Sequence, residues 1–212
     1  MSTKILMYNE ALMICGERSI SSLTEARECR ELLDHVWDNG GVDACLAEAQ
    51  WKFAMRTIEA DYDTSVTTQF GYKRAYTKPS DWIVTSSVCS DEYFNVPLLQ
   101  YVDEAGYWYC DIDVIYVRYV SNASTYGGDI GSWPQTFADF VSGYFAHKII
   151  LKLSSDEDRW AGIEKKKMKL LKEARSRDAM ADPTKFPAQG GWTSSRRGGA
   201  RRDRGNRNSL IG

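Results

Sequence analysis

The sequence predicts an α+β fold: a mainly α-helical bundle, with a small antiparallel β-sheet subdomain inserted between N-terminal and C-terminal helices, plus an extended C-terminal arm. Apolar residues recur at helical spacing on both sides of the chain's middle. From about residue 55, β-branched and aromatic residues dominate instead. We therefore expect a core at 1–182, with helices at about 4–54 and 134–180 and a β-rich insert at about 55–122, followed by a basic flexible arm at 183–212.

The first helix is expected at residues 4–15. Its apolar positions share one face of a helix: Ile5, Tyr8, Leu12 and Cys15. Gly16 follows at the point where a left-handed residue can end a helix. The spacing therefore predicts a short helix that ends at Cys15.

A second helical segment is expected to begin near Ser22, because Ser22 and Glu25 have the spacing of a capping box. Its apolar and small residues follow one face: Cys29, Leu33, Val36, Gly40, Ala44, Ala47 and Trp51. This stripe continues through Asn39, Gly40 and Gly41, which disfavour a regular helix. We expect either one kinked helix or two helices nearly in line.

Turn residues divide the β-rich insert. KPSDW at 78–82 predicts a turn, or one helical turn led by its proline. LLQYVDEAGYWYC at 98–110 predicts a hairpin whose strands are separated by residues 103–106. DIDVIYVRYV at 111–120 predicts another strand. Three or more such strands can form a small antiparallel sheet that covers a helix face.

The C-terminal half of the core is expected to contain two more helices after a flexible loop, TYGGDIGSW, at 125–133. Ser132 and Pro134 open the first helix, at about 134–153. Its inward residues are Phe137, Phe140, Val141, Tyr144, Phe145 and Leu151. Ser154 and Glu157 open the second helix as a capping box.

The second of these helices is expected to have a buried and a basic side. The buried side carries Trp160, Ile163, Lys167, Leu171 and Ala174. The exposed side carries Lys165, Lys166, Lys169, Lys172, Arg175 and Arg177. Such a run is most often a solvated helix face, although it could also meet an acidic partner.

Charge is distributed unevenly between the core and the arm. Residues 183–212 contain seven basic residues and one acidic residue, a net charge of +6. Because the whole chain has a formal net charge of −2, residues 1–182 carry −8. On average the core would repel a phosphate backbone, whereas the arm would attract one.

The five cysteines are dispersed and form no CxxC pair. This usage predicts reduced thiols in a protein made in the cytoplasm. The N-terminal apolar run is too short for a signal peptide, and no later segment has the length needed to cross a bilayer. We therefore expect a soluble protein with no membrane association.

Two small groups of polar residues are candidates for chemistry. If Asp111 and Asp113 lie on a strand, they project from one face about 7 Å apart, as a metal-binding or acid–base pair could. Aspartates at the start of a strand more often face solvent or form turns. His35 and His147 could meet in a metal site, but histidines within helical patterns are more often partly buried and hydrogen-bonded. We expect no catalytic, cofactor-binding or metal site.

The arm carries the other candidate residues: Trp192, Arg196, Arg197, Arg201, Arg202, Arg204 and Arg207. RGG-like spacing is found in RNA-binding segments, but Trp192 is nearly alone as an aromatic residue for base stacking. The composition is equally compatible with a solubilising terminus, phosphate binding or docking on another protein.

Four segments together resemble the head-to-tail adaptor family of short-tailed bacteriophages and prophages, also called tail tubular protein A or head completion protein. The segments are YNEALMICGERSISSLTE (8–25), ACLAEAQWKFAMR (44–56), FGYKRAYTKPSDWI (70–83) and RSRDAMADPTKFPAQGGW (175–192). Their order extends the resemblance over nearly the whole chain. The arm is longer and more basic than in many relatives.

The resemblance implies a structural virion protein with no catalytic step. Family members form a ring, typically of twelve subunits, under the portal protein, where it extends the DNA channel and provides a platform for the next tail (nozzle) protein. The resemblance thus implies assembly in the bacterial cytoplasm, a final place in the virion neck, and four partners: further copies, portal, nozzle protein and genomic DNA. The alternatives are an RNA- or DNA-binding protein that uses its arginine-rich tail, and a hydrolase that uses Asp111 and Asp113.

Overall fold

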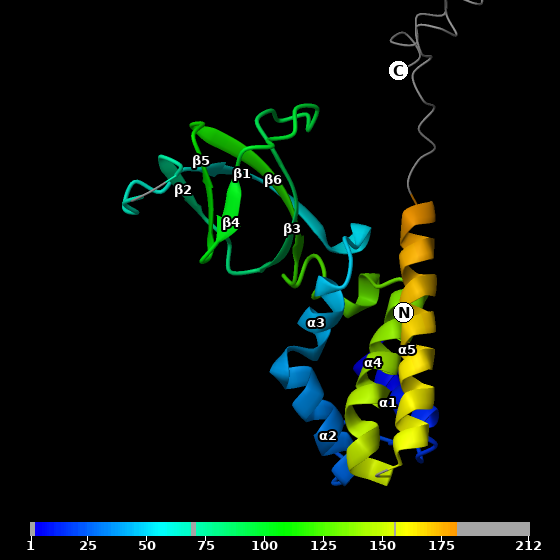
Figure 1. The fold of residues 1–212 in the computed structure, drawn as a ribbon. Coiled ribbons are helices and arrows are strands. Elements are labelled where there is room, and N and C mark those ends of the chain that lie inside the picture. The colour runs from blue at the N-terminus through cyan, green and yellow to red at the C-terminus, as the bar shows by residue number, and fades with distance from the viewer. Residues whose placement is uncertain (1–2, 69–70, 155, 182–212) are drawn as a thin grey trace, which may run out of the picture. The chain divides into compact units, whose positions relative to one another are not determined.

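The computed structural model describes residues 3–68, 71–154 and 156–181 (Figure 1). Along this part of the chain, helices come first and last and strands occupy the middle. This order confirms the predicted α+β class. The predicted arm at 183–212 lies outside the described residues.

The N-terminal helices agree with the sequence except at one start. They are α1 (Lys4–Cys15), α2 (Glu28–Val36), η1 (Trp37–Gly41), α3 (Val42–Ala47) and the short η2 (Lys52–Ala54). Gly16 ends α1 with a φ of 76°, as predicted. Asn39 and Gly40 leave the helical conformation, so α2 and α3 are two helices joined by a kink.

The predicted helix start at Ser22 is wrong, because α2 begins at Glu28. The Ser22 hydroxyl accepts a hydrogen bond from the Thr24 amide two residues later, so it supports a turn rather than a helix. The Glu25 carboxylate accepts from the amide and the hydroxyl of Ser21. The capping-box residues therefore stabilise the loop that precedes α2.

The β-rich insert forms two three-stranded antiparallel sheets rather than one. The strands are β1 (Met55–Asp61), β2 (Arg74–Thr77), β3 (Trp82–Cys89), β4 (Val102–Glu104), β5 (Tyr107–Cys110) and β6 (Val114–Ser121). Their orders are β1-β6-β3 and β2-β5-β4. The sheets share a small core of Tyr76, Val88, Trp108, Cys110, Ile115, Val117 and Tyr119.

The predicted turns are present, although their limits differ. Trp82 donates its amide to the Pro79 carbonyl across the KPSDW turn. The predicted hairpin is β4 and β5, and its turn needs only Ala105 and Gly106, both with positive φ. The strand predicted at 111–120 begins at Val114, because the preceding residues form a bend.

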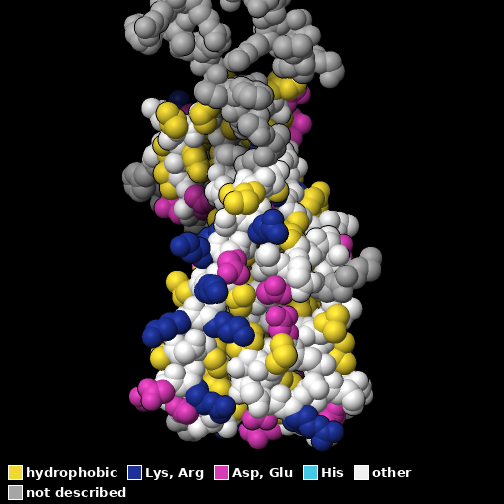
Figure 2. Space-filling view, turned by 90° about the vertical axis from the view of Figure 1, so that its right-hand side faces the viewer, with side chains coloured by type: hydrophobic (Ala, Val, Ile, Leu, Met, Phe, Trp, Pro, Cys, Tyr) yellow, Lys and Arg dark blue, Asp and Glu magenta, His cyan; other side chains and the backbone are white. Residues whose placement is uncertain are grey.

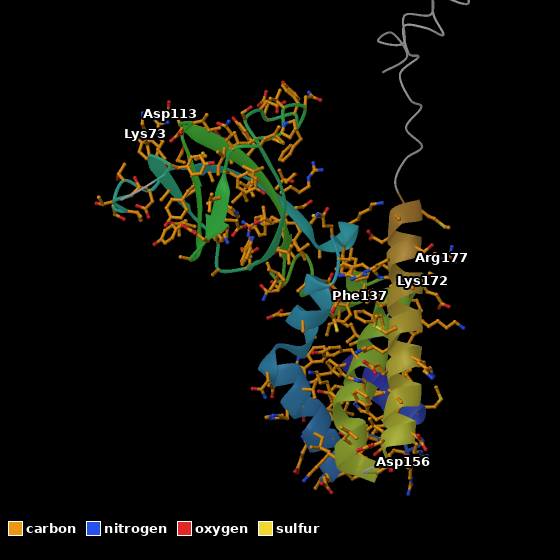
Figure 3. The ribbon with its side chains drawn as sticks, in the orientation of Figure 1. Lys73, Asp113, Phe137, Asp156, Lys172 and Arg177 are labelled. Carbon is orange, nitrogen blue, oxygen red and sulfur yellow. The ribbon has the colours of Figure 1, made fainter. Side chains whose placement is uncertain are left out.

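The C-terminal helices are α4 (Gln135–Ser154), which follows the short η3 (Ile130–Ser132), and α5 (Glu157–Met180). Ser154 belongs to the end of α4, so the cap predicted there for the second helix is wrong. The Asp156 carboxylate instead accepts from the amides of Asp158 and Arg159 at the start of α5. A cap directly before the first turn allows α5 to fold back on α4 (Figure 3).

The loop before α4 is packed and does not behave as the flexible loop that its glycines predicted. Gly127 is buried, donates its amide to the Ser121 carbonyl and accepts the Trp133 indole N–H. A Cβ at this glycine would lie 2.4 Å from the Ser121 carbonyl oxygen. The glycine is therefore required by close approach of the backbone.

One larger core unites the helices with the nearest parts of the strands. It contains buried side chains from α1, α2, α3, α4 and α5, and Val120 from β6. Ile83 and Val84 of β3 also pack against it. The end of β6 and the start of β3 thus anchor the first sheet on the helices.

Candidate assembly surfaces

The seven arm residues predicted to dock on a partner lie outside the described residues: Trp192, Arg196, Arg197, Arg201, Arg202, Arg204 and Arg207. Their role stays a prediction.

The structure does not make a catalytic pair of Asp111 and Asp113. Both aspartates are exposed and lie in the bend between β5 and β6 rather than on a strand face. The Asp111 carboxylate accepts the Lys73 amide at 2.9 Å, whereas Asp113 forms an ion pair with Arg74. Figure 3 labels Asp113 and Lys73 at the same end of the strands. Both carboxylates therefore fix the edge of β2 beside this bend.

The two histidines have different surroundings and form no pair. His35 is exposed on α2, and its Nδ1 lies 3.0 Å from the Asn39 amide nitrogen. His147 of α4 stacks on Trp160 of α5, with ring centroids 5.0 Å apart. Among the described residues, neither ring nitrogen of His147 has a hydrogen-bond partner. His147 thus fills space between α4 and α5.

His147 should make the protein less stable in acid. Burial lowers the pKa of His147 below its ordinary value, and Lys167 and Lys148 lower it further, although Glu164 opposes them. Because the unfolded chain binds this proton more readily, stability is retained above about pH 6.5 and falls as the pH is lowered below it. We expect His147→Phe to reduce the loss of urea midpoint between pH 7 and pH 5, whereas the exposed control His35→Gln should not. An unchanged slope in His147→Phe would contradict this account.

Other kinds of site find little support in the described part of the chain. It contains no group of three His, Cys, Asp or Glu residues arranged to hold a metal ion. None of its helices combines the length and apolar character needed to span a membrane. A hollow of about 290 Å³ is lined by α2–α3 kink residues and by the loop before α4: Trp37, Asp38, Gly40, Val42, Asp43, Gly128, Ile130 and Trp133.

The helix α5 presents its predicted basic face to solvent. Ile163, Leu171 and Ala174 are buried on the opposite side of the helix. Lys165, Lys169 and Lys172 are exposed at spacings of four and three residues, so they form one stripe, which we name the α5 lysine face. Figure 2 shows Lys and Arg side chains on this side of the molecule, with Asp and Glu side chains between them.

Little of the charge on the α5 lysine face is neutralised by its neighbours. Lys169 approaches Glu173 at 3.9 Å, but both side chains are exposed, and such pairs contribute little free energy. Within the described ranges, Lys165 and Lys172 have no ion pair. Farther along α5, Arg175 pairs with Glu48. The stripe is therefore available to an acidic partner.

A second charged surface, on α2, was not predicted from the sequence. Glu28 and Glu31 of α2 and Asp38 of the adjoining η1 are exposed at spacings of three and seven residues, and we name them the α2 acidic face. The carboxylate of Asp34, on the same helix, instead accepts a hydrogen bond from the Tyr8 hydroxyl at 2.8 Å and forms an ion pair with Lys4 at 3.1 Å. The helical spacing of the exposed acids was the available signal in the sequence.

A polar junction ties the three strands of the first sheet together at the end that packs on the helices. The carboxylate of Asp81 accepts hydrogen bonds from Arg56 at 2.8 Å, from the Tyr119 hydroxyl at 3.1 Å and from Ser121. Burial raises the pKa of Asp81, but these three donors outweigh burial and hold it below its ordinary value. The junction joins the starts of β1 and β3 to the end of β6.

Hydrogen bonds between described residues connect parts of the first three segments that carry the family resemblance. In the first, the Asn9 side-chain amide bonds both backbone groups of Ile20. The second and third segments meet through Arg56 and Asp81. In comparisons with known proteins, no family model matches the chain and no curated protein matches it significantly.

Proposed function

We propose that this protein is a head-to-tail adaptor of a short-tailed bacteriophage. It would assemble as a ring under the portal, extend the DNA channel and provide the docking platform for the next tail protein. The observation that carries the proposal is the ordered set of resembling segments, two of which meet where Arg56 of β1 bonds Asp81 in the turn before β3. The resemblance also implies a helical bundle with an antiparallel β portion, and the observed order of helices and strands agrees with this.

The distribution of charge supports the same function. The net charge of −8 on residues 1–182 suits a DNA channel, because a strongly basic wall would hold phosphates and impede passage. The charge of +6 on residues 183–212 suits docking on an acidic surface of the portal. We propose that this segment attaches the ring to the portal, with DNA contact as the second choice.

Deleting residues 193–212 should weaken attachment to purified portal rings by about tenfold or more, because several charge-assisted contacts are lost together. Attachment to portal and to DNA is measured separately by sedimentation. A matched control replaces the six arginines of 196–207 with lysines, which retains the charge but removes bidentate recognition. Loss of DNA binding with unchanged portal binding would reject the docking role.

The second candidate is an RNA- or DNA-binding protein that acts through the arginine-rich tail, which the charge of +6 favours. It requires the free protein to bind nucleic acid with an affinity that falls steeply with salt. The adaptor instead requires a ring on the portal. Native mass spectrometry of the protein, alone and mixed with portal, distinguishes the two: a large particle that needs portal supports the adaptor.

A further inference from the structure

The two charged faces defined above are carried by helices on different sides of α4. The helix α4 packs against both α2 and α5, and Figure 1 shows α2 and α5 on its two opposite flanks. One molecule therefore presents an acidic surface on one flank and a basic surface on the other. The acidic surface and the basic surface of one molecule therefore cannot contact each other.

The chain segments that contain the two faces have opposite net charge. Residues 165–177 contain seven basic residues against Glu173, a net charge of +6. Residues 28–38 contain four acidic residues against Arg30, a net charge of −3 with histidine neutral. Along their helices, the α5 lysine face extends about 10 Å and the α2 acidic face about 15 Å, at 1.5 Å per residue. The stripes are thus comparable in length.

Neither face is neutralised within the described part of the chain. Arg30 reaches Glu31 only at 3.4 Å and bonds mainly with Asp34. In those same ranges, Glu28 and Asp38 have no ion pair. The acids of α2 therefore remain available to basic residues of another molecule, as the lysines of α5 remain available to acids.

We propose that the α5 lysine face of one copy docks on the α2 acidic face of the next copy. The inference rests on the proposed function, because it names the lateral contact of the ring. A contact between two different faces is heterologous, and repeating it produces a closed ring when the rotation between copies closes. Charge pairing between opposite flanks also sets the direction in which copies add. The partner is a second copy of this chain.

Two charge-reversed variants test the contact. Lys165→Glu, Lys169→Glu and Lys172→Glu together make both faces acidic; Glu28→Lys, Glu31→Lys and Asp38→Lys together make both basic. Self-association is measured by sedimentation velocity at low salt and the highest soluble concentration. We expect each variant to lose the self-association of the wild type, and their equal mixture to associate again in alternation. Folding is checked by circular dichroism.

A matched control reverses three exposed basic residues elsewhere: Arg18→Glu, Lys73→Glu and Lys152→Glu. It changes the net charge by the same amount as the lysine variant and should leave self-association unchanged. Zero-length cross-linking of a mixture of ¹⁴N- and ¹⁵N-labelled wild type should join the two faces between molecules. This second measurement does not depend on any variant folding.

The inference is overturned if neither wild type nor the mixed variants associate, if the control loses association equally, or if the cross-links join other surfaces. It is also overturned if particles grow only when DNA is added and the lysine variant abolishes that growth. Rings on the portal with cross-links elsewhere would preserve the proposed function alone. Pairing of the two faces without portal attachment would preserve the contact alone.

Discussion

Replacing Trp51 with alanine should lower the free energy of unfolding by about 4 kcal/mol. Trp51 is only 1% exposed, and its ring lies edge-on to Phe137 with centroids 4.9 Å apart. Its indole N–H also donates to the Cys45 carbonyl at 3.1 Å. The substitution would leave a large cavity where α3, η2 and α4 meet, and this carbonyl would lose its side-chain donor.

Chemical denaturation followed by far-UV circular dichroism measures the change. Trp51→Phe is the matched variant, because it retains much of the ring contact with Phe137 and Phe53 but removes the indole donor. We expect it to be clearly less damaging than alanine. Tyr93→Ala, at a side chain that is 75% exposed, should change stability little. Equal losses at Trp51 and Tyr93 would contradict the packing described above.

Local signals predicted those parts of the fold that depend on neighbouring residues. Gly16 ends α1 because a left-handed residue is needed directly after Cys15. Asn39 and Gly40 interrupt the helical stripe, and the chain kinks there. The alternation of buried residues in β6 likewise follows from the period of a strand. In each case a few consecutive residues carry the physical cause.

The features of the fold that the sequence did not predict depend on contacts between distant segments. Ser154 and Asp156 are both plausible helix caps, and only the path from α4 into α5 selects Asp156. Asp113 suggested chemistry because of its neighbour in sequence, yet its partner is Arg74, from another strand. Glycines at 127 and 128 suggested flexibility, but the first is packed against the Ser121 carbonyl.

The sequence likewise predicted one of the candidate surfaces but not the others. The exposed lysines of α5 follow from helical spacing, so their position was predictable. That α2 carries an acidic face on the other flank of α4 depends on the packing of three helices. Asp81 sits in a turn that the sequence predicted, but its three donors come from residues 25 to 40 positions away. Local sequence patterns do not reveal that donors from distant residues meet at one carboxylate.

Replacing Asp81 with alanine should lower the free energy of unfolding by about 3 kcal/mol. The change removes one acceptor from three donors: Arg56, the Tyr119 hydroxyl and the Ser121 hydroxyl. Ser121 and Tyr119 are buried, so their hydroxyls lose a partner that solvent cannot fully replace. The Arg56 side chain is 35% exposed and can rehydrate, which keeps the loss below that of a fully buried ion pair.

Asp113→Ala is the matched control for Asp81→Ala, because Asp113 also pairs with an arginine but its side chain is 74% exposed. We expect it to change stability little. Hydrogen exchange should separate a local effect from a global one: Asp81→Ala should speed exchange first in β1, β3 and β6. Equal denaturation midpoints for the two variants would show that the junction does not stabilise the first sheet.

The same carboxylate should contribute to unfolding in acid. Because the pKa of Asp81 is lower in the folded protein than in the unfolded chain, its stabilisation is present above about pH 4 and is lost as the pH falls. Asp81→Asn should therefore be less stable than wild type at neutral pH, with the difference shrinking in acid. An asparagine can still accept from Tyr119 or Ser121, but it cannot form the ion pair with Arg56. If the difference in denaturation midpoint stays constant from pH 7 to pH 3, the substitution acts through packing and not through the charge of the Asp81 carboxylate.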